Sequence, residues 1–303
     1  MKKSKKRQTV KSAKRLDHVV LPVTALGIAR DRLEALGFTV AADAVHPFGT
    51  ENCCVYFSDN TYLEPLGIAQ RETCEAAAIK GNAFIARDQA YRFRHPADGF
   101  SAIAFTSDDI KADHKNYVKN GISAGRVVNF KREILDSKGA SQTVSFSMTA
   151  AGDLRSPDFF YLACQRENLA DFDLKKLQRH KNGTKSIREI VLSEVNPSDF
   201  QYLLQEVIDQ RDQNAHSFGI ELQSANANIA VHSPVGMKAW FGADIEQPER
   251  GLIGRAIVFG VGNLDKTREW FAKNEISFHE IGNRLIVDPA PGQGAIFAFE
   301  AGK

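Results

Sequence analysis

Two short stretches decide the fold: Leu16-Asp17-His18-Val19-Val20-Leu21-Pro22-Val23 and, one helix later, Asp59-Asn60-Thr61-Tyr62-Leu63-Glu64-Pro65. The first is rich in apolar and β-branched residues, which is typical of strands, and the second opens with the turn pair Asp59-Asn60. An amphipathic helical pattern separates them. His18 and Glu64 are therefore expected on different strands of one small sheet. A metal site is built from side chains that are held in this way by rigid elements.

The order of one strand, one helix and several shorter strands occurs four times along the chain, which indicates an internal repeat. The four modules open at Leu16, Phe100, Ile187 and Arg255. A residue that can cap a helix precedes each expected helix: Thr24, Asp108 or Asp109, Asn196 and Asn263. The predicted fold class is α+β, with four βαβββ modules.

We expect two domains of two modules each, residues 16–166 and residues 187–303, joined by a polar linker over residues 167–186. Residues 67–99 form a long insertion that is expected to cover one mouth of the first domain. Residues 1–15 hold eight of the 39 Lys and Arg residues and no acid, which predicts a disordered basic tail. The remaining 31 basic and 37 acidic groups give a mildly acidic body.

The composition is typical of a soluble globular protein, with 43% hydrophobic and 25% charged residues. No apolar run approaches the roughly 20 residues of a membrane helix, and the N-terminus lacks the apolar core of a signal peptide. Four cysteines at irregular spacing predict no disulfide framework. We therefore expect a cytoplasmic protein without a membrane partner. Only the basic tail suggests nucleic acid, so no such partner is expected, and a homodimer is left open.

The repeat and the Leu-Asp-His opening resemble the vicinal oxygen chelate superfamily, which includes glyoxalase I, extradiol dioxygenases and bleomycin-resistance proteins. A narrower resemblance is to the bacterial glyoxalase-like domain group. It rests on His46-Pro47-Phe48-Gly49-Thr50-Glu51-Asn52, on Asp59-Asn60-Thr61-Tyr62-Leu63-Glu64 and on Phe160-Tyr161-Leu162-Ala163-Cys164-Gln165. The resemblance spans roughly residues 15–300 and implies two glyoxalase-like, cup-shaped domains.

In this superfamily the first and last strands of two modules supply the ligands of a divalent cation. The resemblance therefore implies a metal site of His18 and Glu64, with His46 as the nearest third ligand. Such nitrogen and oxygen ligands suit zinc, nickel, manganese or iron(II). Module two offers only Ser101 or Ala102 and a residue near Leu162, so a protein without metal is the alternative. Glu189 takes the place of His18 in the second domain and is expected to be a rim charge.

The remaining candidate residues surround the same strands. Glu64 and Tyr62 are the candidate catalytic residues, because a carboxylate can shuttle a proton and both side chains share one strand face. Thr50, Asn52 and His95 are candidate substrate-binding residues. The predicted function is a divalent-metal-assisted lyase or isomerase acting on a small oxygenated metabolite in the first-domain cup. The alternatives are a metal-free protein that sequesters a small molecule, an extradiol-type dioxygenase and a scaffold that acts through its basic tail.

Overall fold

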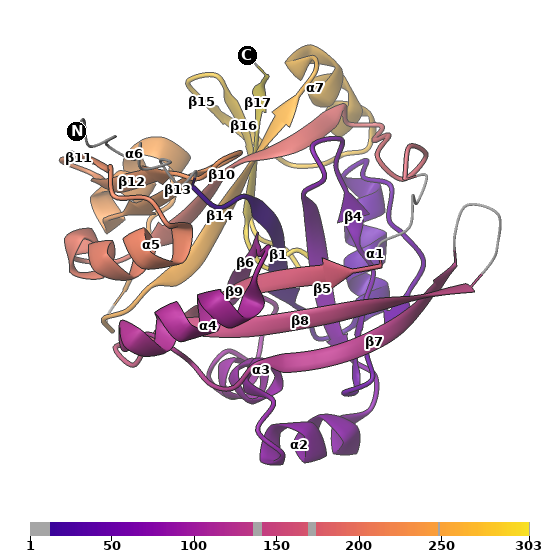
Figure 1. Ribbon diagram of the computed structural model, residues 1–303. Helices are drawn as coiled ribbons and strands as arrows, with labels where there is room; N and C mark the ends of the chain where they lie inside the picture. The colour runs from indigo at the N-terminus through magenta and orange to yellow at the C-terminus, as the bar shows by residue number, and fades with distance from the viewer. Residues whose placement is uncertain (1–12, 136–140, 169–173, 248, 303) are drawn as a thin grey trace, which may run out of the picture.

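The computed structural model describes residues 13–135, 141–168, 174–247 and 249–302 (Figure 1). Within these residues the chain forms two curled sheets and seven α-helices. Strands β1 to β9 make the first sheet, and strands β10 to β17 make the second. The predicted α+β class is confirmed, and modules one and two share one sheet while modules three and four share the other.

Module one follows its sequence pattern. Its helix ends where Gly37 adopts a φ of +91°, which glycine reaches without strain. Before its last strand, the Asp59 carboxylate accepts a hydrogen bond of 3.1 Å from the backbone amide of Thr61 and so closes the turn. Its elements are β1 (Leu16–Pro22), α1 (Leu26–Ala35), β2 (Ala44–Val45), β3 (Thr50–Asn52), β4 (Val55–Tyr56) and β5 (Tyr62–Ile68).

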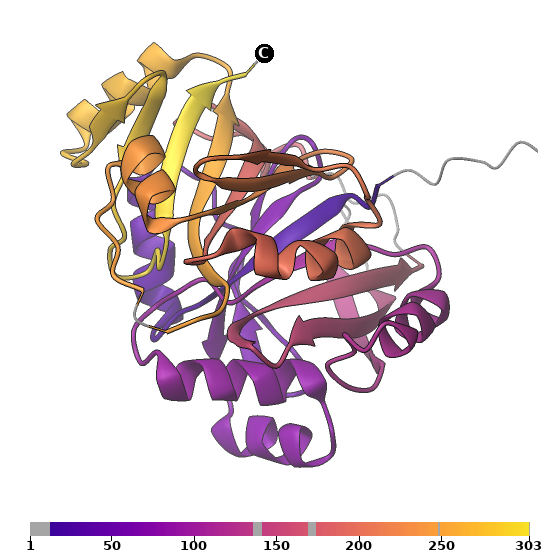
Figure 2. The same ribbon diagram turned by 90° about the vertical axis from the view of Figure 1, so that its left-hand side faces the viewer.

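The insertion between modules one and two folds largely into two helices, α2 (Arg71–Ile79) and α3 (Ala83–Arg94). They lie together at one end of the molecule in both views (Figures 1 and 2). Phe84 of α3 packs in one cluster with Val20 of β1 and Phe160 of β9. Because Val20 and Phe160 face the hollow of the first sheet, α3 covers part of the first cup.

Module two completes the first sheet with long strands that curl over the cup. Its elements are β6 (Ala102–Thr106), α4 (Ile110–Lys119), β7 (Val128–Leu135), β8 (Ser141–Asp153) and β9 (Ser156–Glu167). Their pairing brings Phe130 of β7 opposite Phe146 of β8. These two rings stack at 4.9 Å and pack beside the cup cluster, so the β7–β8 pair forms an aromatic wall of the cup.

The second sheet repeats this plan. Its elements are β10 (Thr184–Ser193), a 3-10 turn η1 (Pro197–Phe200), α5 (Gln201–Ile208), β11 (Asn214–His216), β12 (Gly219–Gln223), β13 (Asn228–His232), α6 (Pro234–Phe241), β14 (Ile253–Val261), α7 (Leu264–Lys273), β15 (His279–Ile281), β16 (Arg284–Val287) and β17 (Ile296–Ala301). The module pattern does not predict α6. Its signal is local, since Ser233 caps it by accepting from the Gly236 amide at 3.2 Å and Pro234 takes the first helical position.

The predicted helix caps are confirmed at two of the four positions. Asp109 accepts from the Ala112 amide at 3.0 Å, and Asn263 accepts from the Lys266 amide at 3.1 Å. The prediction for Thr24 is wrong, because Ala25 holds the cap position of α1 and no side chain accepts there. Asn196 holds the cap position of η1 without a side-chain cap bond. The Thr24 hydroxyl does not cap α1 because it donates to the Asp98 carboxylate at 2.9 Å.

The strand order explains why His18 and Glu64 meet. The first sheet runs β2-β3-β5-β1-β6-β9-β8-β7, with β4 also paired to β5. The opening strands β1 and β6 lie antiparallel at its centre, and each has the closing strand of its own module beside it in parallel. The register pairs His18 with Tyr62 and Val20 with Glu64. The second sheet has the corresponding order, β11-β12-β13-β10-β14-β17-β16-β15.

One hydrophobic core joins the two sheets on the faces that turn away from the cups. Val19 and Leu21 of β1 belong to this core, together with Ile190 of β10 and Phe259 of β14. Alternation along β1 then places His18 and Val20 on the opposite, cup-facing side. Burial of the odd-numbered residues therefore fixes which face of β1 carries the candidate site.

The segment expected as a polar linker packs against the first domain where it is described. His180 accepts a hydrogen bond of 3.0 Å from the Thr39 amide, and its Nε2 lies 3.0 Å from the carbonyl oxygen of Tyr56. The Asn182 amide donates to the Leu36 carbonyl at 2.9 Å. Residues 1–12 of the expected basic tail lie outside the described residues, whereas the Lys14 amide already donates to Ile208 at 2.8 Å.

Candidate functional site

His18 and Glu64 face each other inside the first cup. The Nε2 atom of His18 lies 3.4 Å from Oε2 of Glu64, and both residues are buried. The ring of Tyr62 stacks on the His18 ring with 4.5 Å between centroids. The register of β1 and β5 produces this arrangement, because His18, Tyr62 and Glu64 all occupy cup-facing positions. The structure thus brings these three predicted site residues together.

His46 lies in the turn before β3 and reaches the same carboxylate. Its Nε2 atom is 3.6 Å from Glu64 Oε1, and its Nδ1 atom is 3.0 Å from Thr50 Oγ1. Burial lowers the pKa of His46 to about 4, so the imidazole is neutral at pH 7. Arg132 approaches Nε2 at 3.3 Å. Since a guanidinium only donates, Nε2 is the acceptor and Nδ1 carries the proton.

Asn52 links His46 to Glu64. Its side-chain nitrogen donates to Glu64 Oε1 at 2.6 Å and lies 3.4 Å from His46 Nε2. The imidazole nitrogen and the carboxylate oxygen are both acceptors, so the amide between them holds them close. Thr50 and Asn52 therefore position other protein side chains in this structure. Their predicted contact with a substrate stays a prediction.

A β-bulge adds a residue that the sequence reasoning missed. The pairing of β1 with β6 shifts between Leu16 and His18, so Asp17 lies at an irregularity. Bulges beside active sites re-aim a side chain. Here Asp17 Oδ1 forms an ion pair of 2.7 Å with Arg166 of β9 and lies 3.6 Å from His18 Nδ1. The only sequence signal was that Asp17 adjoins His18.

The Asp17–Arg166 pair is buried and supports Tyr62. Burial opposes ionisation of Asp17, but Arg166 and His18 together outweigh burial and hold the pKa of Asp17 below its usual value. Arg166 also donates to the hydroxyl oxygen of Tyr62 at 3.1 Å. Burial raises the pKa of Tyr62 well above 10, against the effect of Arg166, so the phenol keeps its proton.

The structure leaves one predicted residue outside this network. His95 follows α3, and its Nε2 atom forms an ion pair of 3.1 Å with Asp158. Its ring lies 4.8 Å from the ring of Tyr91. Among the described residues, none of its interactions reaches His18, His46 or Glu64. The long insertion thus folds over the cup through α3 without carrying His95 to the carboxylate.

The donor set does not fit a metal ion in this arrangement. His18 precedes α1 by the same interval as Ala102 precedes α4, so Ala102 and Leu162 occupy the positions equivalent to His18 and Glu64. Neither side chain can bind a cation. The amide of Asn52 donates to Oε1 of Glu64, and the guanidinium of Arg132 faces Nε2 of His46. Within the described ranges, no three His, Cys, Asp or Glu side chains form a group that could hold a metal.

The second cup is filled by protein. Met237 and Phe241 of α6 pack there against Val191 and Ala256, the facing residues of the central strands. Glu189 holds the place equivalent to His18, but the prediction of a rim charge is wrong. It is buried and forms an ion pair of 2.9 Å with Arg284. The first cup is therefore the site of interest.

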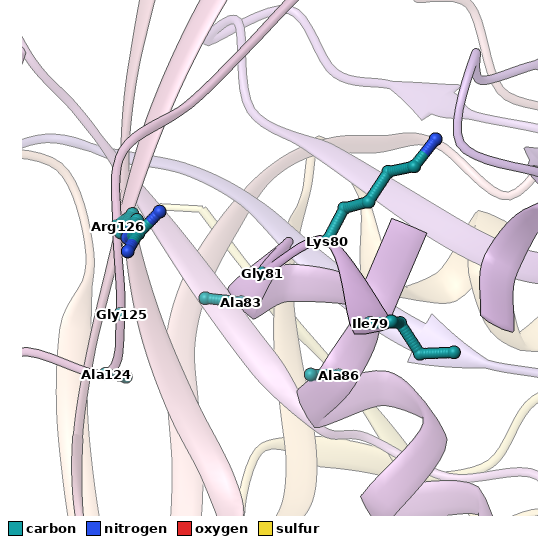
Figure 3. A pocket seen from close by; sticks show the side chains of 8 residues that line it. All are labelled: Ile79, Lys80, Gly81, Ala83, Ala86, Ala124, Gly125 and Arg126. Atoms are coloured by element: carbon teal, nitrogen blue, oxygen red, sulfur yellow. The ribbon is translucent and has the colours of Figure 1, made fainter. Parts of the chain in front are cut away.

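A surface recess of the described structure lies away from these residues. Its volume is about 440 Å³, and it opens between the α2–α3 turn and the segment leading into β7 (Figure 3). Ala83 and Ala86 line one side, and Gly125 and Arg126 line the other (Figure 3). It contains none of the predicted site residues.

No helix among the described residues is long and apolar enough to cross a membrane. The expected cytoplasmic location, the small-molecule partner and the option of a homodimer stay predictions. The domain limits at residues 166 and 187 stay predictions as well.

Comparisons with known proteins agree with the fold. A search among curated protein sequences gave no match. Among solved structures, a hypothetical protein from Staphylococcus aureus is similar over 94% of this chain and 98% of its own, with a TM-score of 0.64 and 16% identity. A triple mutant of 4-hydroxymandelate synthase from Streptomyces coelicolor is similar over 97% of this chain and 95% of its own, with a TM-score of 0.58 and 11% identity.

A Mn(II)-bound glyoxalase from Novosphingobium aromaticivorans is also similar, over 95% of this chain and 82% of its own, with a TM-score of 0.51 and 12% identity. At these identities the likeness shows the fold alone. The family model of the glyoxalase-like domain, however, matches residues 16–208, which is more than half of the chain and includes the whole of the first cup. This match shows that the protein belongs to the glyoxalase-like domain family.

Proposed function

We propose that the protein is an enzyme of the lyase or isomerase type that moves a proton on a small oxygenated metabolite in the first cup, with Glu64 as the base. One observation carries the proposal. The Glu64 carboxylate is buried in the cup, with Oε1 held by Asn52 at 2.6 Å and Oε2 facing His18 at 3.4 Å. A carboxylate fixed in this way is suited to general base catalysis.

The proposed step is proton abstraction from a carbon next to a carbonyl group. Oε2 of Glu64 takes the proton, and the electron pair of the C–H bond passes to the carbonyl oxygen, which becomes an oxyanion. Where the carbon that loses its proton also carries a hydroxyl group, the hydroxyl proton passes to the oxyanion. Return of the first proton to the former carbonyl carbon then gives the isomeric hydroxy carbonyl compound, so no oxidant or reductant is required. Asn52 keeps the second carboxylate oxygen in place during both transfers.

Tyr62 is proposed to stabilise the oxyanion. Its phenol keeps its proton at neutral pH because burial raises its pKa. Arg166 already donates to the phenol oxygen, so the phenol hydrogen is left to donate to a substrate. A donor placed in advance where charge develops contributes strongly inside a cup that excludes water.

No metal takes part in this proposal, because module two supplies no ligand and N–H donors face Glu64 Oε1 and His46 Nε2. Manganese is bound in the similar glyoxalase structure from Novosphingobium aromaticivorans, and it is a property of that protein. An extradiol dioxygenase needs an iron site of two histidines and a carboxylate, and the same N–H donors argue against that alternative.

The test follows exchange of carbon-bound protons for deuterium by NMR in D₂O, across a panel of small ketones and oxo acids. Glu64→Gln is expected to lower the exchange rate by roughly 10²–10⁴-fold. The matched control is Glu51→Gln, which removes a carboxylate from β3 at a position that alternates away from the cup. It should keep the wild-type rate, and so should wild-type protein treated with a chelator.

Equal rates for the two variants would refute the role of Glu64. Chelator-sensitive exchange that a divalent metal restores would refute the metal-free step. A second candidate function is sequestration of a small molecule, which is favoured by Ala102 and Leu162 at the ligand positions of module two. It predicts a ligand-induced rise in melting temperature, insensitive to chelator, with no exchange in any compound that binds.

A further inference from the structure

Arg132 is a cation without an acidic partner inside the first cup. Its guanidinium is half-buried, and its hydrogen-bond contact among the described residues is the neutral His46 ring at 3.3 Å. No Asp or Glu of the described chain forms an ion pair with it. Some other part-buried arginines of this protein do have such partners, among them Arg92 with Asp88, Arg166 with Asp17 and Arg284 with Glu189.

The sheet directs Arg132 into the cup. Phe130, two residues earlier on β7, packs with the cup cluster and lies edge-on to His46 at 6.0 Å. Alternation places Arg132 on the same face as Phe130, whereas Lys131 between them is exposed. The β7 strand therefore presents one basic side chain to the cup and another to solvent.

The surroundings of Arg132 make this position costly unless an anion occupies it. A partly desolvated charge without a partner destabilises the folded state. Its hydrogen-bond partner is the His46 ring at 3.3 Å, and the nearby Glu64 carboxylate has Oε1 bonded to Asn52 rather than to Arg132. A guanidinium offers paired N–H donors that match the two oxygens of a carboxylate.

We propose that Arg132 binds the carboxylate group of the substrate, so the substrate class is that of small monocarboxylates. This inference deepens the proposed function and rests on it, because the bound ligand is a substrate only if the proposed reaction takes place in the cup. A monoanion fits better than a phosphate dianion, because the cup also holds the Glu64 carboxylate, which repels a second negative charge. The stacked rings of Phe130 and Phe146 supply an apolar wall for the body of the ligand.

The test is isothermal titration calorimetry of the full chain with benzoate, benzamide and inorganic phosphate at fixed ionic strength. Benzamide has the shape of benzoate without its charge. Wild-type protein is expected to bind benzoate, and to bind benzamide and phosphate at least roughly tenfold more weakly. Arg132→Gln should weaken benzoate binding by about tenfold or more, and Arg132→Lys should weaken it less. Lys131→Gln is the matched control and should bind benzoate as wild type does.

Equal benzoate affinity in Arg132→Gln and wild type would overturn the proposal. Failure of wild type to distinguish benzoate from benzamide, or a preference for phosphate, would overturn it as well. Binding does not require proton transfer, so Glu64→Gln should bind benzoate at least as tightly as wild type. If Glu64 proves uninvolved in exchange, benzoate binding through Arg132 is unaffected. If Arg132 proves uninvolved, the Glu64-dependent exchange still stands.

Discussion

The buried ion pair between Asp17 and Arg166 offers the sharpest test of the site geometry. The Asp17→Asn substitution keeps the shape of the side chain and removes its charge. Asp17 is 2% exposed, and its Oδ1 lies 2.7 Å from the Arg166 guanidinium. Removing one member of a buried pair typically costs about 3–5 kcal/mol, because the other charge stays buried without a partner. The Arg166 side chain is 23% exposed, so water solvates it in part and we expect about 3 kcal/mol.

The pH dependence of this loss has a definite sign. The pKa of Asp17 is lowered in the folded protein, so the carboxylate contributes stability at neutral pH. That contribution is complete above the unfolded value of about 3.9 and is lost as pH falls through the lower folded pKa. The free energy of unfolding should therefore differ between wild type and Asp17→Asn by a constant amount from pH 5 to pH 7. The difference should shrink in stronger acid.

The assay is urea unfolding followed by tryptophan fluorescence, with a double-mutant cycle. Asp17→Asn made in an Arg166→Met background should cost less than about 1 kcal/mol, because the orphaned charge is gone. Asp153→Asn is the matched control: its 2.7 Å partner Arg155 is 63% exposed, and such a surface pair contributes about 0–1 kcal/mol. If Asp17→Asn lowers the free energy of unfolding no more than Asp153→Asn does, the bulge does not create a buried charge pair.

Two further predictions concern the turn that carries His46. Gly49 has a φ of +95°, and a Cβ there would lie 2.5 Å from the Gln70 carbonyl oxygen, so Gly49→Ala should lower the unfolding free energy by more than about 2 kcal/mol. Gly81→Ala, with a φ of +90° and open space, should cost about 1 kcal/mol, and equal losses in urea unfolding would contradict this reasoning. Because burial lowers the pKa of His46 to about 4, its contribution to stability falls by up to about 1.4 kcal/mol per unit as pH drops from 6.5 to 4. His46→Gln should flatten that slope, and an unchanged slope would count against a buried neutral ring.

Features encoded by neighbouring residues could be predicted from the sequence. The β1 and β5 strands, the end of α1 at Gly37 and the Asp59 turn follow from local periodicity and turn chemistry. The resemblance to a known repeat then placed His18 and Glu64 in one cup, and the strand register agrees. Thr24 failed as a cap for a nonlocal reason: its hydroxyl donates to Asp98, which is distant in sequence.

By itself, the sequence determined the repeat, the two sheets and the strands that hold His18, Tyr62 and Glu64, because hydrophobic alternation sets which face of a strand is buried. Only the tertiary structure decided what surrounds the Glu64 carboxylate. A bulge turns Asp17 toward Arg166, and the long β7 strand brings Arg132 to His46. These partners lie far apart in the chain, and their contacts depend on strand pairing and curvature rather than on local pattern. Tertiary contacts also place N–H donors at Glu64 Oε1 and His46 Nε2, two atoms of the expected metal ligands.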